Sequence, residues 1–346
     1  MMKFMIGYQQ MNSDKFLIAL QGHRDHIKEV YFSWGDIPNG RGRLDGASCA
    51  SALEAQNQQL SELKTISESG IGLNLLLNGN CYGAQSLARI FFNKIGNCVD
   101  YLGSQLNLTS VTTTSPVIAR FIKTNFPTLK IRASVNMEIG TTQGMDYIAE
   151  FFDGYYMKRE YNRNLQKIEQ LKKWCDANSK ELYLLANSGC LNHCSVHNFH
   201  DNLVAHESEI AAMDNAFEFR GLCHDYLRLK EKQQSFIRNT NFIRPEDIRL
   251  YDPYFTAAKL ATRTNLNPVV VLDAYIRGSY SGNVMELLEP NHAEAFYPWI
   301  LENSHFPDDF ADNVMRCTKD CDSCSYCQGI FDQIKINLNI GENILC

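Results

Sequence analysis

The sequence lacks the features that would place the protein in a membrane or outside the cell. Its longest apolar runs, such as residues 71–77, are far shorter than the ~20 residues that a membrane-spanning helix needs. The first residues, MMKFMIGYQQMNSDKF, contain no long apolar stretch followed by small residues, so we expect no secretory signal peptide. These absences predict a cytoplasmic protein without membrane contact.

An excess of positive charge and several common motifs are also missing. The chain has 33 Lys and Arg against 39 Asp and Glu, a net charge of −6. Nucleic-acid binding needs a basic face, so we expect no nucleic acid as an obligate partner. No G-x-G-x-x-G or G-x-x-x-x-G-K-[ST] motif follows a predicted strand, and no H-E-x-x-H pair is present. The usual signatures of a nucleotide-binding sheet and of a zinc peptidase are therefore absent.

Strand-like and helix-like segments alternate from the first residues to about residue 263. Eight strands are predicted, at residues 3–8, 29–34, 71–78, 108–114, 130–136, 152–158, 181–187 and 257–263. Helices are predicted between them at residues 14–23, 52–69, 83–96, 117–126 and 164–178. Such alternation indicates parallel strands joined by helices, and eight units of this size match an α/β protein with a TIM-type (β/α)8 barrel. An open doubly wound sheet is the alternative.

The chain is predicted to divide near residue 265. Residues 1–265 form the barrel and carry the catalytic mouth. Residues 266–346 form a helical C-terminal extension with a cysteine-rich, metal-binding tail and a short strand at 334–340.

Functional side chains of such barrels follow the carboxyl ends of the strands. This rule selects the residues Asp36, Asn78, Asn80, Cys81, Asn136, Lys158, Arg159, Arg163, Asn187, Gly189, Cys190 and Cys194. The closely spaced Cys190 and Cys194 have four histidines nearby, His193, His197, His200 and His206. Thiolates at short spacing can hold zinc or an iron–sulfur cluster. Two buried cysteines among surface histidines, or a catalytic Cys–His pair, are the alternatives.

Cysteine is abundant, with twelve residues, and four of them lie close together within the predicted extension. Cys317, Cys321, Cys324 and Cys327 have the spacing C-x3-C-x2-C-x2-C, the reverse of a run that holds clusters in bacterial ferredoxins. Disulfides rarely persist in the cytoplasm, so this spacing points to metal. It predicts a second iron–sulfur cluster or a structural zinc ion.

Several segments resemble the collagenase-like peptidase superfamily, and most closely its peptidase-like members. They are NFPTLKIRASVNMEIG, YNRN, LYLLANSGCLNHCSVHNFHDNLVAH, NFIRPEDIRLYDPY and KLATR. The resemblance extends from about Gly72 to Cys327, and its most specific parts are NSGCLNHC, FIRPED and the terminal cysteines. It implies a TIM-type barrel and, for many members, oxygen-independent hydroxylation of tRNA, ribosomal RNA or the ubiquinone ring. It also implies a four-iron four-sulfur cluster held by four cysteines at the barrel mouth, with prephenate as oxygen donor for some members.

The resemblance implies particular ligands for this cluster. Cys190, Cys194 and Cys223 match three of the family's cysteines. The fourth is Cys81, after the third predicted strand, or alternatively Cys49, after the second.

The sequence departs from the family pattern in two respects. The collagenase-like signature has Glu and Phe before its Gly–Cys pair, where residues 186–190 here read Ala-Asn-Ser-Gly-Cys. The extra domains and basic surface of the RNA-modifying members are also missing. Both departures weaken a direct transfer of proteolysis or RNA modification.

We therefore expect an iron–sulfur enzyme that modifies a small molecule or a peptide by oxygen-independent hydroxylation. An anionic substrate is expected to be held by three cations after the sixth strand, Lys158, Arg159 and Arg163. Substrate orientation and proton transfer are expected from Asn136, Asn187 and His193. A metal-dependent collagenase-like peptidase and a cluster-holding subunit of a hetero-oligomeric modifying enzyme, which needs a protein partner, are the alternatives.

Overall fold

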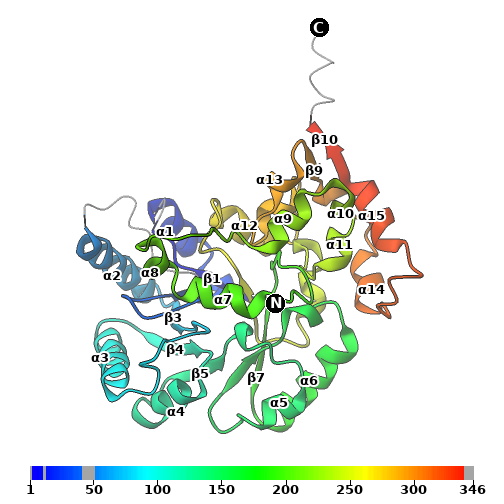
Figure 1. Ribbon diagram of the computed structural model, residues 1–346. Coiled ribbons are helices and arrows are strands. Elements are labelled where there is room, and N and C mark those ends of the chain that lie inside the picture. The colour runs from blue at the N-terminus through cyan, green and yellow to red at the C-terminus, as the bar shows by residue number, and fades with distance from the viewer. Residues whose placement is uncertain (1, 11–12, 41–50, 339–346) are drawn as a thin grey trace.

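Eight parallel strands form a closed barrel in their sequence order. The computed structural model describes residues 2–10, 13–40 and 51–338. The strands are β1 (Lys3–Gly7), β2 (Ile27–Phe32), β3 (Gly72–Leu77), β4 (Leu108–Thr113), β5 (Lys130–Ala133), β6 (Gly154–Tyr156), β7 (Glu181–Leu185) and β8 (Ala257–Leu260). β1 pairs with both β2 and β8 and so closes the barrel. The predicted TIM-type barrel is confirmed, and all eight predicted strands are present (Figure 1).

Helices cover the outside of the barrel. The first of them are α1 (Ser13–Gly22), α2 (Ala52–Glu68), α3 (Arg89–Gln105), α4 (Pro116–Asn125), α5 (Thr142–Asp146) and α6 (Leu165–Ala177). Side-chain oxygens begin several of them: Ser51 accepts from the Glu54 N–H at α2, and Ser115 accepts from the Ile118 N–H at α4, where Pro116 is the first helical residue.

The helix predicted at residues 83–96 is the least accurate prediction. α3 begins at Arg89 and continues to Gln105, because its buried apolar residues recur at helical spacing through Leu102. Gly83 has a φ of 68°, a left-handed conformation that interrupts a helix before this point.

The barrel interior holds a buried ion pair. The Arg132 guanidinium donates to the Glu29 carboxylate, and Asn74 Nδ2 donates to the same carboxylate at 2.7 Å. Arg132 also lies 4.6 Å from the ring centroid of Tyr183. These side chains fill the middle of the barrel.

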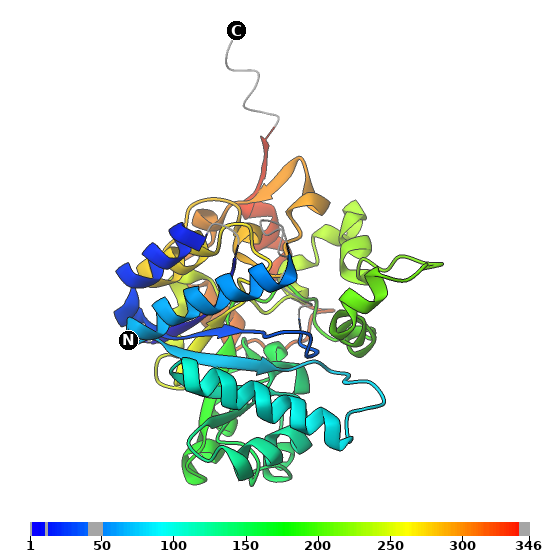
Figure 2. The ribbon, with the colours of Figure 1, turned by 90° about the vertical axis from the view of Figure 1, so that its left-hand side faces the viewer.

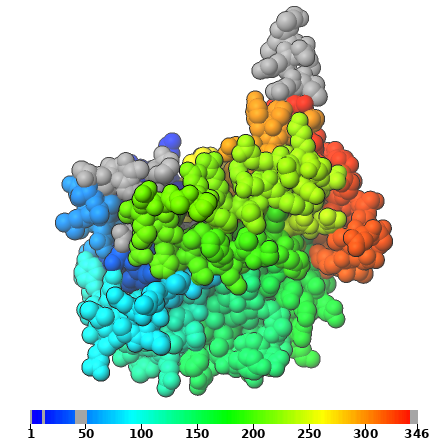
Figure 3. Space-filling view, viewed as in Figure 1, coloured from blue at the N-terminus to red at the C-terminus, as the bar shows by residue number. Residues whose placement is uncertain are grey.

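A second hydrophobic cluster packs beside the barrel. It contains residues from 227 to 334, including Phe236, Phe296 and Phe331. The later elements are α7 (His197–Ala205), α8 (Glu207–Ala211), α9 (Leu222–Arg228), α10 (Lys230–Gln233), α11 (Phe236–Asn239), α12 (Pro268–Arg277), α13 (Ala293–Phe296), α14 (Phe310–Met315), α15 (Tyr326–Ile334), β9 (Trp299–Leu301) and β10 (Lys335–Asn337). Figures 1 and 3 show the orange and red C-terminal helices gathered at one side of the molecule, next to α9–α11.

One hydrophobic cluster packs the barrel strands against their helices, and the boundary between it and the second cluster does not fall at residue 265. Val271 and Leu272 of α12 pack in the barrel core, whereas Leu227 and Phe236 belong to the second cluster. The domain boundary at residue 265 therefore stays a prediction.

Short 3-10 turns connect several elements, namely η1 (Arg24–His26), η2 (Val135–Met137), η3 (Arg159–Tyr161), η4 (Pro245–Tyr251), η5 (Val284–Leu287) and η6 (Asn303–His305). The segment with α7, α8 and the loop to α9 projects from the body of the molecule (Figure 2). Among the helices of the described residues, none combines the length and the apolar character needed to cross a bilayer.

Candidate functional site

A cavity of about 210 Å³ lies where the barrel strands end at their carboxyl termini. We call it the mouth cavity. Its walls come from β2, from β8 and from the segments that follow β3, β5, β6 and β7, and α7 and α9 contribute further side chains. This is the end at which TIM barrels place their chemistry.

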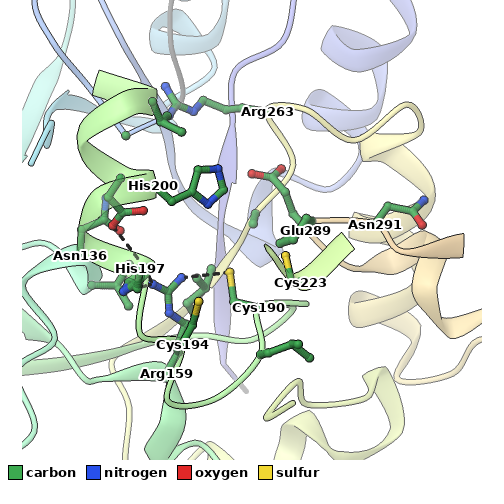
Figure 4. A pocket seen from close by; sticks show the side chains of 18 of the residues that line it. Asn136, Arg159, Cys190, Cys194, His197, His200, Cys223, Arg263, Glu289 and Asn291 are labelled. Carbon is green, nitrogen blue, oxygen red and sulfur yellow. Dashed lines mark hydrogen bonds and ion pairs between the residues drawn. The ribbon is translucent and has the colours of Figure 1, made fainter. Parts of the chain in front are cut away.

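Three of the predicted cluster ligands line the mouth cavity. Cys190 and Cys194 follow β7, and Cys223 lies in the first turn of α9 (Figure 4). Arg159 Nη1 donates a hydrogen bond to Cys190 Sγ at 3.6 Å. Burial, together with the neighbouring Cys190 and Cys194 thiols, raises the pKa of the Cys223 thiol to about 11. The fold therefore brings Cys223 of α9 to the cavity that the closely spaced Cys190 and Cys194 line.

The described residues do not form a preassembled single-ion site at these thiols. A tetrahedral zinc site with Zn–S bonds of ~2.3 Å holds its sulfur atoms about 3.8 Å apart. In residues 2–10, 13–40 and 51–338, no group of three or more His, Cys, Asp or Glu side chains has the spacing for one metal ion. An iron–sulfur cluster distributes its thiolates over several irons, so it needs a wider ring of cysteines.

The two candidates for the fourth ligand, Cys81 and Cys49, have different outcomes. Cys81 is not among the residues that line the mouth cavity, and its thiol is hydrogen-bonded to His206. Cys49 lies outside the described residues. His200 does reach the cavity beside Cys223: a Cβ on Gly221 would lie 3.5 Å from His200 Cε1 and 3.7 Å from Cys223 Sγ.

His197 is the best-connected titratable group of the mouth cavity. Its Nδ1 lies 2.7 Å from Glu138 Oε1, its Nε2 lies 3.3 Å from Asp201 Oδ2, and Arg159 contacts its ring. Burial lowers the pKa of His197, and Arg159 lowers it further, against the opposing effect of Asp201 and Glu138. The imidazole therefore lies between two carboxylates, in a position to exchange protons with either.

The three predicted catalytic residues have different surroundings. Asn136 lines the mouth cavity. Asn187 is buried instead and joins β7 to β8, because its Nδ2 donates to the carbonyl of Ala261 at 2.8 Å and its Oδ1 accepts from the same residue. His193 has a side chain that is 84% exposed, while its backbone N–H donates to Glu160. The strand-end rule gives the position of a residue but not the direction of its side chain.

The three predicted cations also separate. Arg159 lines the cavity, whereas Lys158 pairs with Glu160 at 2.6 Å and is not part of the lining. Arg163 is only 3% exposed, and its guanidinium donates to the carbonyls of Ile237, Thr240 and Phe242. Its place does not fit the predicted contact with an anionic substrate.

Three further cations line the cavity and were not predicted as site residues, namely Arg220, Lys259 and Arg263. Lys259 Nζ lies 4.2 Å from the ring centroid of Tyr31. Lys259 and Arg263 belong to KLATR at the end of the eighth predicted strand, so the same strand-end rule identifies them. No comparable signal marks Arg220, which lies in the segment before α9.

One wall of the cavity comes from the C-terminal extension. Residues Glu289–His292 line it, and backbone hydrogen bonds join Glu289 to Asn187 and Gly189. A Cβ on Gly189 would lie 2.2 Å from the carbonyl oxygen of Pro290, so only glycine permits this approach. The glycine before Cys190 is the sequence signal for this contact, but it does not reveal the contacting segment.

The geometry defines a TIM-barrel protein whose mouth is lined by thiols, cations and a histidine held between two carboxylates. No family model matches the chain. The chain is similar to an uncharacterized protease of Methanocaldococcus jannaschii, 25% identical over 276 residues, which are 76% of this chain and 77% of that protein. It is also similar to the solved structure of a U32 peptidase, with a TM-score of 0.52 and 13% identity over 75% of this chain and 92% of the other. Together these matches confirm the resemblance to the collagenase-like, or U32, peptidase superfamily.

Proposed function

We propose that the chain is an iron–sulfur enzyme that modifies a small molecule or a peptide by oxygen-independent hydroxylation. The observation that carries the proposal is the convergence of Cys190, Cys194 and Cys223 on one cavity at the functional end of the barrel. The reaction exchanges a hydroxyl group for a hydrogen atom, R–H + R′–OH → R–OH + R′–H. It needs an organic hydroxyl donor and no further oxidant. Because the enzyme relies on free thiols, we place it in the cytoplasm.

Different residues of the mouth cavity have different roles in this proposal. Cys190, Cys194 and Cys223 would hold the cluster, and Arg159 donates a hydrogen bond to one of these sulfurs. When bound, a cluster with an open iron supplies redox or Lewis-acid chemistry to the substrate. Lys259 and Arg263, at the carboxyl end of β8, provide two cationic groups that can bind a carboxylate.

His197 supplies proton transfer in this proposal. Its ring lines the cavity, with Nδ1 against the Glu138 carboxylate and Nε2 against that of Asp201. A proton taken from the reacting carbon can therefore pass to Glu138 through the imidazole. Asn136 lines the same wall and can orient a polar substrate group by hydrogen bonding.

The test is anaerobic purification followed by iron and acid-labile sulfide quantification. The holoprotein is then incubated with prephenate, the donor that the family resemblance implies, and with a metabolite and peptide extract. Mass spectrometry should find a product with one added oxygen atom. A protein that binds neither iron nor sulfide after anaerobic reconstitution contradicts the proposal. Activity that appears only with a co-purified chain supports the hetero-oligomeric alternative.

A thiol-dependent peptidase is the second candidate, and one arrangement favours it. The Cys81 thiol is hydrogen-bonded to His206, and His206 Nδ1 lies 3.0 Å from Glu209 Oε2. His206 lowers the pKa of Cys81, and the Gly83 N–H, 3.4 Å from the sulfur, lowers it too. A thiol, an imidazole and an orienting carboxylate are the parts of an activated nucleophile.

Peptide hydrolysis separates the two candidates. The second predicts cleavage of a casein-derived peptide mixture that Cys81→Ala abolishes and that persists after the iron is removed. Cys98→Ala is the matched control, since burial raises the pKa of Cys98 to about 12 and keeps it a thiol. Cleavage that both variants retain, or no cleavage at all, contradicts a Cys81-dependent peptidase.

A further inference from the structure

We propose that residues 316–327, which we call the tail loop, form a second metal site of the tetrathiolate class, separate from the mouth cavity. The site joins α14 to α15, and its ligands are Cys317, Cys321, Cys324 and Cys327. Its metal is structural, either a zinc ion or an iron–sulfur cluster. Nothing in this proposal depends on the hydroxylase function.

The protein chain alone does little to hold the tail loop in place. None of residues 316–325 is buried, although the flanking Met315 and Ile330 are. The described hydrogen bonds inside the loop are few, such as that from Ser323 Oγ to Asp320 Oδ2 at 2.8 Å. A ten-residue irregular segment without buried side chains gains no hydrophobic stabilisation to offset its ordering entropy. Four metal–thiolate bonds supply that stabilisation in small metal-binding loops.

The backbone at the first cysteine already has the form of a thiolate-binding turn. Lys319 has a φ of 65°, in the left-handed region that a lysine adopts at a cost. This conformation directs the Lys319 N–H to Cys317 Sγ at 3.3 Å. The turn therefore places a backbone donor against the sulfur of the first proposed ligand.

A buried positive charge, the Arg163 guanidinium, lies near the tail loop. Arg163 is a fully enclosed cation, and each acceptor of its guanidinium is an uncharged backbone carbonyl, of Ile237, Thr240 or Phe242. Among the described residues no carboxylate lies within ion-pair distance of Arg163, and Asp247, which acts on it at longer range, is paired with Arg244. Burial of a cation without a counter-charge is costly.

The tail loop provides that counter-charge. The Cys327 sulfur lies within electrostatic range of both Arg163 and Lys319. A zinc ion with four thiolates carries a net charge of −2, and four-cysteine clusters are also anionic. Arg163 below and Lys319 within the loop are two cations placed to balance it.

Assembly of the site requires movement of the tail loop alone. Within residues 2–10, 13–40 and 51–338, no group of metal-binding side chains has single-ion spacing, so the four sulfurs must draw together. Cys327 is fixed by α15, whose Ile330, Phe331 and Ile334 pack in the second hydrophobic cluster. The other three cysteines lie in the exposed loop, so their movement breaks no packing.

The experiment measures zinc, iron and sulfide in the full-length protein purified anaerobically. The test variants are Cys324→Ser, whose side chain is exposed, and the double variant Cys317→Ser/Cys321→Ser. Substitution is preferable to truncation, because loss of α15 would remove buried residues of the second cluster. Cys98→Ser, on α3, is the matched control.

Both test variants should lose one whole metal site while far-UV circular dichroism is unchanged. Loss of about one zinc per chain assigns a zinc site, and loss of iron with sulfide assigns a cluster. Lys319→Gln should release the tail metal to a chelator about threefold to tenfold faster than wild type does. Unchanged zinc, iron and sulfide in folded Cys317→Ser/Cys321→Ser protein would overturn the proposal. If the double variant fails to fold, the same measurement on Cys324→Ser decides.

Discussion

The cysteines of the mouth cavity and those of the tail loop reach their sites by opposite routes. Cys190 and Cys194 share the loop after β7, whereas Cys223 lies in α9, and the fold of the α7–α9 region brings the two segments to one cavity. The four tail cysteines lie within eleven positions of the sequence and need only a local turn. A site of the first kind depends on tertiary structure, and one of the second kind depends on spacing. The two sites should therefore respond separately to substitution.

The largest expected effect is the loss of the mouth cluster alone. Cys190→Ala, Cys194→Ala and Cys223→Ala should each lose most of the visible iron–sulfur absorption, because alanine opens a coordination position. Far-UV circular dichroism should remain, since these thiols line a cavity and do not fill the core. Absorption spectra and iron content on the three variants provide the measurement.

Cys175→Ala is the control for this experiment, because Cys175 is buried in α6, away from the cavity. Its iron content should equal that of wild type. If all three mouth variants kept full iron and full absorption, the assignment of the ligands would be wrong. A simultaneous loss of the tail metal would show that the two sites are not independent.

The sequence was sufficient to predict the barrel but only part of the mouth. The apolar strands, the helices between them and the Ser115–Pro116 helix start are local signals, and local signals identify elements well. His197 and Glu289 were not selected, because their roles depend on which way α7 faces and on where residues 288–292 fold back. Asn187 and Arg163 were placed at the correct strand ends, yet their side chains satisfy backbone groups instead of entering the cavity. Direction is set by packing, which residue spacing does not encode.

Arg163 lies near the tail loop and not in the mouth cavity, and its substitution is the second prediction. Arg163→Met should lower the free energy of unfolding by about 3–5 kcal/mol, because three buried carbonyls lose their donor. Urea denaturation with wild type as reference measures it. The iron content of the mouth should not change. A loss below ~1 kcal/mol together with weakened binding of prephenate would restore the substrate role that the sequence suggested.

The third prediction uses pH to separate the mouth from the tail. Burial lowers the pKa of His292 to about 4, and its Nε2 lies 3.1 Å from the Gly189 carbonyl oxygen. In the unfolded chain this histidine titrates near ~6.5. Between these two values the unfolded state binds a proton that the folded state excludes, so stability falls as the pH decreases from 6.5 to 4. The loss reaches up to about 3 kcal/mol.

His292→Gln is the matched variant, because glutamine keeps a donor for Gly189 but does not titrate. Its stability should depend less steeply on pH over this range, as measured by urea denaturation at several pH values. Parallel curves for wild type and variant would show that His292 is not responsible. Release of the tail metal between pH 6.5 and 5 should be the same in both proteins, since His292 lines the mouth cavity.

The smallest expected effects distinguish two neighbouring cations at the rim of the mouth. Arg159 Nη1 donates to Cys190 Sγ, whereas Lys158 forms a partly exposed ion pair with Glu160. A hydrogen bond to a ligand sulfur stabilises the reduced, more negative cluster, so Arg159→Gln should lower the midpoint potential of the mouth cluster. We expect a shift on the order of 30–60 mV, which for one electron equals about 0.7–1.4 kcal/mol.

Lys158→Gln should leave that potential unchanged and reduce stability by at most ~1 kcal/mol, as is usual for exposed pairs. Redox titration followed by electron paramagnetic resonance measures both variants, and equal shifts in the two would mean that general positive charge, not the contact with Cys190, sets the potential.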